Sequence, residues 1–358
     1  MSGERRRPGA TANTPDEIVR LRRAYEGYRR GVDVLDALTR WAAAERPPRR
    51  VLDVGAGTGN WYRSLRARLG SGVRYVGVDP DPDMAEALRS LTAGDTMAEV
   101  VVVDAAALPV GEPFDWVGLH FVLPHVEDPP AIVRAALRHV DEDGLLLVAA
   151  NSASHLRRWR DMQRQALEAL GVGCPQDAVC VPHPTLEEIP HLAPPGFVSL
   201  RVTIRGTFSF PDAEAAMDYY QAVLWRRGLS PSEAEDPDVR QRLASHMRAR
   251  IRAEIAFHGR FTVSRSSGFV AMRRQGKVAD RSGNRKVAWP TAPRWEMHGA
   301  PVWEGSRANA RPALAAPQLL ATNRQPVGKQ PPQRDGRAGR RRGRASHPPC
   351  RPGARGRT

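Results

Sequence analysis

Short apolar runs alternate with amphipathic stretches along the first part of the chain. The apolar runs predict buried strands, and the stretches between them repeat apolar residues at helical spacing. Such alternation is typical of parallel strands that are joined by helices and buried on both faces of one sheet. The five expected strands lie at residues 51–54, 75–78, 100–103, 116–122 and 145–150, with helices at residues 61–69, 84–91 and 131–140.

Further elements flank this alternation. Thr14 and Glu17 are placed to form a capping box around a helix with Pro15 at its first position, running to about residue 30. Together the elements predict an α/β fold: a Rossmann-like, doubly wound, mostly parallel seven-stranded sheet with N-terminal helices and a helical insert. The remaining elements are expected at residues 32–44, 155–170, 212–227 and 237–257 as helices, and at about residues 198–208 and 261–272 as strands.

The last part of the chain has a different composition. Residues 275–358 hold 11 prolines and 10 glycines without sustained periodicity, which predicts a disordered tail rich in arginine, proline and glycine. All three lysines of the chain lie there, so the tail is either a working segment or a readthrough or shifted-frame extension. We expect one domain over residues 1–274. Its parts are N-terminal helices at about 14–45, a core at about 49–151 and a substrate-covering part at about 152–274.

Net charge also divides the chain. The tail carries 18 Lys and Arg against 4 Asp and Glu, whereas residues 1–274 carry 36 against 35. The net charge of +15 therefore belongs to the tail, and the nearly neutral domain has no electrostatic footprint of a nucleic-acid binder. Non-specific contact with phosphates is expected from the tail alone, at its arginine run 337–344.

Cysteine use and hydropathy bear on location and metals. Three cysteines are too few for a disulfide framework, and no run approaches the roughly 18 apolar residues of a spanning helix. The sequence therefore predicts a soluble cytoplasmic protein that does not enter the membrane. The spacing of Cys174, Cys180 and His183 matches no common zinc finger, so no metal site is expected.

A glycine-rich loop follows the first apolar strand. Asp53-Val54-Gly55-Ala56-Gly57-Thr58-Gly59 opens a helix, so its backbone can turn tightly and approach a ligand. A dinucleotide fingerprint would need a third glycine where Asn60 stands, and the acid two residues before Gly55 gives a different spacing. The loop indicates a nucleotide-type site, with a plain glycine turn as the alternative.

Three aspartates stand at the ends of successive strands. Asp53 lies near the end of the first apolar run, and Asp79 and Asp104 directly follow the second and third. A carboxylate at the second strand end can accept the hydroxyls of a ribose, and one at the third can meet an adenine amine. One aspartate alone is readily explained as a helix or turn cap, but three at consecutive strand ends favour a binding site.

The glycine-rich loop and the strand-end aspartates resemble motifs of the class I S-adenosylmethionine (SAM)-dependent methyltransferases. The resemblance is strongest to their small-molecule, ubiquinone-biosynthesis-like or type 11 branch. Residues 51–59 resemble motif I, residues 114–128 the fourth-strand motif, and residues 195–197 the approach to the sixth strand. The resemblance covers about residues 15–274 and implies a SAM-dependent enzyme. The residues that it implies for cofactor binding are Asp53, Gly55, Ala56, Gly57, Asp79, Pro80, Asp104, Ala105 and Leu119.

Methyl transfer is an in-line displacement, so a base is needed only where the acceptor must lose a proton. His120 and His125 flank the expected methyl position and are the candidate catalytic residues; His120 is favoured because it ends the strand. For both, an ordinary structural histidine is the alternative. Trp159 and Tyr220 could cover the acceptor, or pack in the core.

Three functions stay open from the sequence. The first is methyl transfer to a small-molecule acceptor at oxygen, nitrogen or carbon; the second is an RNA methyltransferase that uses the basic tail; the third is a non-catalytic SAM-binding module. The chain lacks an Asn-Pro-Pro-Tyr motif or a cysteine after the fourth strand, which disfavours base methylation. The sequence leaves the oligomeric state and the methylated atom open.

Overall fold

The computed structural model describes residues 15–104, 107 and 111–275. Their strands form one sheet of eight strands in the order β1-β7-β8-β6-β5-β2-β3-β4. Strands β4, β3, β2, β5 and β6 pair in parallel, whereas β8, β7 and β1 are antiparallel to their neighbours. The strands are β1 (Arg29–Arg30), β2 (Arg50–Val54), β3 (Arg74–Asp79), β4 (Ala98–Val102), β5 (Phe114–His120), β6 (Val140–Asn151), β7 (Phe197–Phe210) and β8 (Phe261–Arg274).

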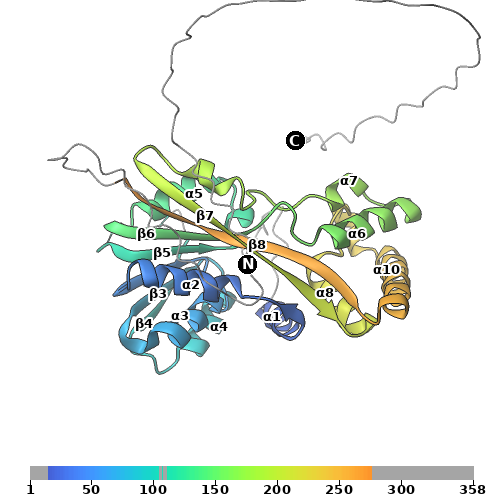
Figure 1. Ribbon diagram of the computed structural model, residues 1–358, viewed down its shortest axis with the longest axis horizontal. Coiled ribbons are helices and arrows are strands. Elements are labelled where there is room, and N and C mark those ends of the chain that lie inside the picture. The colour runs from blue at the N-terminus through green and yellow to red at the C-terminus, as the bar shows by residue number, and fades with distance from the viewer. Residues whose placement is uncertain (1–14, 105–106, 108–110, 276–358) are drawn as a thin grey trace, which may run out of the picture. The chain divides into compact units, whose positions relative to one another are not determined.

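Helices cover both faces of this sheet. One face packs against α2 and α3, and the other against α5 (Figure 1). The helices are α1 (Pro15–Tyr28), α2 (Val34–Glu45), α3 (Asn60–Leu69), α4 (Pro82–Thr92), α5 (Pro129–Leu137), α6 (Arg157–Leu170), α7 (Pro175–Ala178), α8 (Ala213–Val223), α9 (Pro231–Glu235) and α10 (Pro237–His258). Short 3-10 turns lie at η1 (Gly70–Gly72), η3 (Leu123–His125) and η4 (Ile189–Leu192).

The central strands confirm the expected doubly wound arrangement. Residues 145–150 of β6 are all buried, because the strand has neighbours on both sides and helices on both faces. The chain leaves β2 toward β3 and β4 on one side and returns to β5 and β6 on the other. The carboxyl ends of β2 and β5 therefore border the switch point, where open α/β sheets bind their ligands.

The strand number differs from the sequence-based expectation. We predicted seven strands and a first helix to about residue 30, but α1 ends at Tyr28 and Arg29–Arg30 form β1. Arg29 pairs with Phe208 and Arg30 with Thr207, so the edge of β7 fixes these two residues as a strand. Two arginines carry no strand pattern, and this pairing is a tertiary effect. Thr14, Ala105 and the predicted disordered tail beyond residue 275 lie outside the described residues.

Beyond the end of β6, β7 and β8 continue as an antiparallel pair of strands. Residues 261–266 of β8 pair with β7 but not with β6, and this part of the pair packs against α6, α8 and α10 (Figure 1). Trp159, Tyr219 and Tyr220 are buried here among the phenylalanines of both strands. We call this group of buried residues the outer cluster. Its aromatic side chains are core residues, as the simpler of the two sequence-based interpretations held.

The longest helix belongs to the outer cluster. Asp236 caps the N-terminus of α10, and Gly259 ends the helix with a φ of 75°. Along its length arginines alternate with the buried residues that face the cluster. Within the described part of the chain, no helix is long and apolar enough to cross a membrane.

Candidate functional site

The glycine turn between β2 and α3 lies at the switch point. Gly55 and Ala56 donate backbone hydrogen bonds to the carbonyl of Val78 at 2.8 and 3.0 Å, which ties the turn to β3. Gly55 and Gly57 have φ values of 71° and 53°, in the left-handed region that favours glycine. A Cβ on Gly55 would lie 1.9 Å from a methyl carbon of Val122, whereas a Cβ on Gly57 would meet nothing within 4 Å. The turn is therefore packed at its first glycine and open at its second.

Asp79 ends β3 and faces this turn. One carboxylate oxygen, Oδ2, accepts a hydrogen bond from the backbone N–H of Gly57 at 2.8 Å, and Oδ1 accepts one from Asp81 at 3.0 Å. Burial raises the pKa of Asp79 above its ordinary value, although the two backbone hydrogen bonds oppose that shift. Two residues that lie 22 positions apart in the sequence thus meet at one strand end.

Asp53 lies deeper, at the penultimate position of β2. Its side chain is 1% exposed, and Oδ2 accepts a hydrogen bond from the Tyr75 hydroxyl at 2.9 Å. Burial, helped by the nearby Asp79 charge, raises the pKa of Asp53 to about 7 in spite of the Tyr75 hydrogen bond. The sequence interpretation missed Tyr75. Gly77 gives the signal for it, since a Cβ there would lie 2.9 Å from the Tyr75 hydroxyl oxygen.

The two carboxylates have no cationic partner of their own. Among the residues that the structure describes, neither Asp53 nor Asp79 forms an ion pair with an arginine or histidine. Burying an ionised carboxylate without a counter-charge is costly, and an opposite charge brought close removes much of that cost. The site therefore suits a ligand that carries positive charge.

His120 is the last residue of β5, next to β2. Its ring lies edge-on to Trp61, with 4.2 Å between the ring centroids. Both ring nitrogens are shielded from solvent and make no hydrogen bond within the described residues. Burial lowers the pKa of His120 to about 3, so the imidazole is neutral at physiological pH. An unpaired buried polar group costs about 1–3 kcal/mol.

Trp61, in the first turn of α3, is held in place by α2. Its indole N–H donates to the hydroxyl of Thr39 at 3.0 Å, and that hydroxyl donates to the carbonyl of Leu35 at 2.7 Å. Trp61 and Leu35 pack in the core on the face of the sheet that includes Val51, and Asp53, two residues further along β2, shares that face. The tryptophan that covers His120 is thereby fixed from a different helix.

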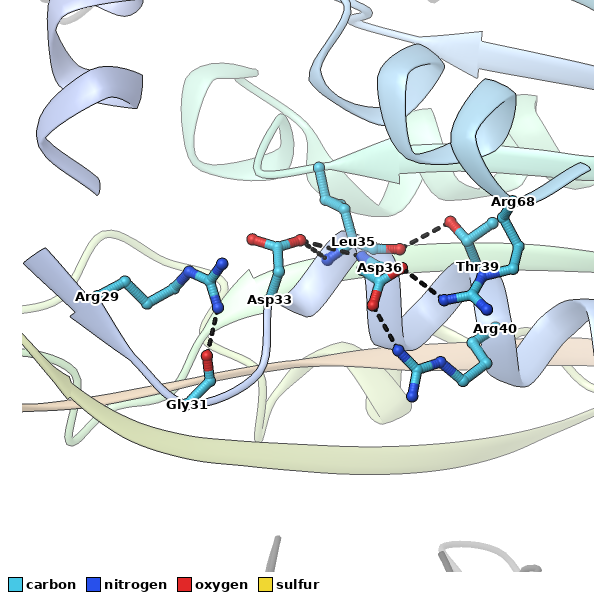
Figure 2. A network of polar contacts seen from close by, with 8 residues as sticks. All are labelled: Arg29, Gly31, Asp33, Leu35, Asp36, Thr39, Arg40 and Arg68. Carbon is cyan, nitrogen blue, oxygen red and sulfur yellow. Dashed lines mark hydrogen bonds and ion pairs between the residues drawn. The ribbon is translucent and has the colours of Figure 1, made fainter. Parts of the chain in front are cut away.

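Figure 2 shows how α2 itself is anchored. Asp33 caps its first turn by accepting from Leu35 and Asp36 at 2.9 and 3.0 Å. Asp36 forms ion pairs with Arg40 of the same helix and with Arg68 of α3. These contacts join α2 to α3, the helix that the glycine turn opens.

The other predicted site residues lie around this centre. His125, in η3, is exposed, in contrast to His120, and so is Pro80. Leu119 is fully buried with its side chain on the opposite face of the sheet, so only its backbone is on the site side. Asp104 follows β4, and its carbonyl accepts from the N–H of Ala107 at 2.9 Å. The predicted Ala105 is outside the described range.

A further histidine at this edge escaped the sequence interpretation. His155 Nδ1 lies 2.9 Å from the carbonyl oxygen of Ser266 and 3.2 Å from the hydroxyl of Ser267, which in turn donates to Asn151 at 2.9 Å. Burial and the arginines around it lower the pKa of His155 to about 3. Its position four residues beyond the end of β6 was the available signal.

Comparison with known proteins relates this arrangement to one family. Residues 25–192 match the model of a family described as a methyltransferase domain. This part of the chain is similar to a methyltransferase domain. Residues 25–192 include the glycine turn, both buried aspartates and His120, so the family match and the site coincide.

Curated relatives match this chain over part of their length. The ubiquinone biosynthesis O-methyltransferase of Xanthomonas axonopodis pv. citri (strain 306) is 38% identical over 102 residues, which are 28% of this chain and 42% of that protein. The demethylmenaquinone methyltransferase of Staphylococcus aureus (strain MRSA252) is 29% identical over 114 residues, 32% of this chain and 47% of that protein. The chain thus spans less than half the length of these relatives.

Solved structures show a distant likeness. The YcgJ protein from Bacillus subtilis is 16% identical, with a TM-score of 0.44 over 68% of this chain and 98% of that one. The N-methyltransferase NodS from Bradyrhizobium japonicum, solved with S-adenosyl-L-homocysteine (SAH), is 18% identical, with a TM-score of 0.31 over 35% of this chain and 64% of that one.

The residues of this site fit an adenosyl sulfonium cofactor. Gly57 borders open space at the turn, and within the described residues the buried carboxylates of Asp53 and Asp79 have no counter-charge. SAM carries positive charge on its sulfur and on its amino group and presents ribose hydroxyls that a carboxylate can accept. In the described residues, no group of three or more histidine, cysteine or acidic side chains is placed to hold a metal ion.

Proposed function

We propose that this chain transfers the methyl group of SAM to a small-molecule acceptor at an oxygen, nitrogen or carbon atom. The observation that carries the proposal is the pair of buried, uncompensated carboxylates, Asp53 and Asp79, beside the open glycine of the turn. Bound SAM would supply an electrophilic methyl group on a sulfonium. The protein's part is to hold that cation, orient it and admit the acceptor in line.

Each strand end has a role in this proposal. Asp79 accepts hydrogen bonds from the ribose hydroxyls, and Asp53 orients the positively charged amino acid end. Asp104 and Ala105 face the adenine. The backbone of Leu119 and His120 borders the methyl group. Burial at Asp53 supports this assignment, because electrostatic attraction to a cation is strongest where water is excluded.

The acceptor side lies toward the outer cluster. The carboxyl ends of β5 and β6 point to it, and polar groups of Asn151, His155 and Ser267 line up there. The curated relatives are named for ubiquinone and menaquinone methylation, which supports a small-molecule acceptor. The tail offers the only basic surplus for an RNA substrate, and it lies outside the described residues. The small number of cysteines favours a reducing cytoplasm as the site of action.

Calorimetry with SAH tests the cofactor half of this proposal. The full chain should bind SAH, and Asp79→Ala should weaken binding about a hundredfold, because two hydrogen bonds from ribose to a charged group are lost. Asp218→Ala, a matched change at an exposed position of α8, should leave the affinity within twofold. Absence of heat with either SAM or SAH for folded protein would end the proposal.

Labelled SAM tests the transfer half. Incubation of the full chain with methyl-labelled SAM and a small-molecule extract should place label in extractable compounds of low mass. Label that appears only in RNA would show that the acceptor is RNA and would refute a small-molecule acceptor. SAH binding without any transfer, across extracts from several growth conditions, would leave a binding module instead of an enzyme.

A further inference from the structure

The imidazole of His120 lacks hydrogen-bond partners at both of its ring nitrogens. Within the described residues, it is the one side chain with two buried polar atoms, Nδ1 and Nε2, that both lack a hydrogen-bond partner. Nearly all buried polar groups in proteins are paired with protein atoms or with ordered water. The ring therefore needs a hydrogen-bond partner that the described residues do not supply.

The ring occupies a slot that a glycine creates. A Cβ on Gly118 would lie 2.5 Å from His120 Nε2 and 2.4 Å from Cζ3 of Trp61, so any other residue would expel one of the two rings. Gly118 pairs with Asp53 across the β2–β5 ladder. Because side chains two apart on a strand share a face, the imidazole lies on the same face as the Asp53 carboxylate, at the switch point.

The backbone beside the ring is strained. Phe121, directly after His120, has a φ of 60°, which is an unfavourable conformation for a bulky side chain. Its N–H still donates to the carbonyl of Ala149 at 2.8 Å, so the conformation is held by the sheet. Strain of this kind gathers at ligand-binding and switch positions, and it is independent of the unpaired ring.

The chemistry of the ring selects its ligand. A neutral imidazole presents one N–H donor and one nitrogen acceptor. The amino acid end of SAM or SAH presents the complementary pair, a carboxylate that accepts and an ammonium that donates. A ring held neutral in a closed slot is badly matched to removing a proton from an acceptor, but it is well matched to this pair.

We propose that His120 binds the amino acid end of SAM and SAH, its ring turning out of the Gly118 slot to do so. This inference rests on the proposed function, since it takes the adenosyl ligand as given. It assigns His120 to cofactor binding and leaves deprotonation of the acceptor to other groups or to none.

Nuclear magnetic resonance on the full chain tests the proposal directly. In protein labelled with ¹⁵N-histidine, long-range ¹H–¹⁵N spectra report the tautomer and hydrogen bonding of each ring. Saturation with SAH should move both His120 ring nitrogens to the shifts of a hydrogen-bonded neutral tautomer, and leave exposed His258 unchanged. His120 resonances that stay in place when SAH saturates the protein would overturn the proposal and point to an internal water as the partner.

Matched variants test it by affinity. His120→Phe keeps a ring but no nitrogen and should weaken SAH binding about tenfold, whereas His120→Asn, with a donor and an acceptor, should recover most of the loss. His258→Phe, the same change at an exposed position, should bind like the wild type. Equal affinity of wild type and His120→Phe would refute the role of His120 alone.

Two outcomes separate this inference from the proposed function. If the wild-type chain binds no SAH, the proposed function fails first and the inference with it. If His120→Phe melts before it can be assayed, His120→Asn and the spectra of the wild type decide the question.

Discussion

Two buried polar side chains of the outer cluster, Arg160 and Gln163, are paired much more fully than Asp53 and His120 at the switch point. In the outer cluster, the Arg160 guanidinium donates to three backbone carbonyls, and Gln163 both donates to backbone carbonyls and accepts from Tyr220. At the switch point, Asp53 accepts one bond from a tyrosine and His120 makes none. Among the described residues the indole nitrogen of Trp159 in the outer cluster is also unpaired, but His120 is the one side chain with two unpaired buried nitrogens. Buried polar groups are nearly always paired, so this double deficit favours the switch point as the place where a ligand binds.

The largest expected effect concerns the pH dependence of stability. The carboxyl of Asp53 has a pKa of about 7 in the folded chain against 3.8 as its ordinary value. At Asp53 the folded chain therefore binds an extra proton between these pH values, so the contribution of this one group to the free energy of unfolding falls as pH rises from 4 to 7. The lowered pKa values of His120 and His155 give contributions of the opposite sign over the same range. The Asp53 contribution is about 4 kcal/mol, and it is measured as the difference between wild type and an Asp53 variant in urea titrations of ligand-free protein at several pH values.

Asp53→Asn isolates that contribution. The variant should lack the Asp53 contribution, so its free energy of unfolding should gain on that of the wild type as pH rises from 4 to 7. It should be the more stable of the two at pH 8, since an amide carries no charge to bury. A wild-type slope that persists unchanged in the variant would assign it to other groups. SAH should stabilise the wild type at pH 8 and the variant much less.

Arg160 of the outer cluster should contribute to the stability of the fold but not to SAH binding. Arg160→Met removes three hydrogen bonds and leaves the carbonyls of Ala153, His155 and Val179 without this donor. We expect a loss of about 3 kcal/mol in unfolding free energy by urea titration. The SAH affinity of the folded variant should remain within twofold. A parallel loss of affinity would show that the two regions are not separable.

Gly57, the glycine of the turn that borders open space, allows a test of the binding surface at the switch point. Gly57→Ala puts a methyl group into the space expected to hold the cofactor, and its φ of 53° adds about 1 kcal/mol of backbone strain. SAH affinity should fall about tenfold by calorimetry. Gly171→Ala is the control, because Gly171 has a φ of 64° with equal space around it but ends α6. Equal affinities of the two variants for SAH would show that Gly57 is not part of the binding surface.

The smallest effect is expected where α2 holds Trp61. Thr39→Val keeps the shape of the side chain but leaves the indole N–H unpaired, which should cost about 1 kcal/mol in a thermal unfolding assay. Thr92→Val, at another buried threonine whose hydroxyl bonds only within its own helix region, should cost less. SAH affinity should drop only a few-fold in Thr39→Val. A larger drop would make Trp61 a direct contact of the ligand.

The sequence predicted the central sheet well because each buried strand there is a local apolar run. The glycine turn and the strand-end acids were predictable for a related reason: parallel strands bring their carboxyl ends to one edge, so order along the chain implies proximity. Asp79 and Gly57 confirm this reasoning by a direct hydrogen bond. The strand β1 was not predictable, because Arg29 and Arg30 adopt it only by pairing with β7.

Side-chain orientation was beyond the reach of sequence pattern. Nothing in the spacing shows that the Tyr75 hydroxyl reaches back to Asp53, or that the His120 ring folds over Gly118. In both cases a glycine provides the space, at Gly77 and at Gly118, and an isolated glycine in a strand is a weak signal of close packing. Such contacts depend on rotamers, which are selected by neighbours from distant parts of the chain.

Strand β8 has a consequence for how the molecule unfolds. One half of it contributes Phe269 and Ala271 to the core beneath α2, and the other half contributes Phe261 and Val263 to the outer cluster. A single continuous strand cannot leave one core without disturbing the pairing that supports the other. The two cores should therefore melt together in one cooperative transition, with no stable half-folded species between them.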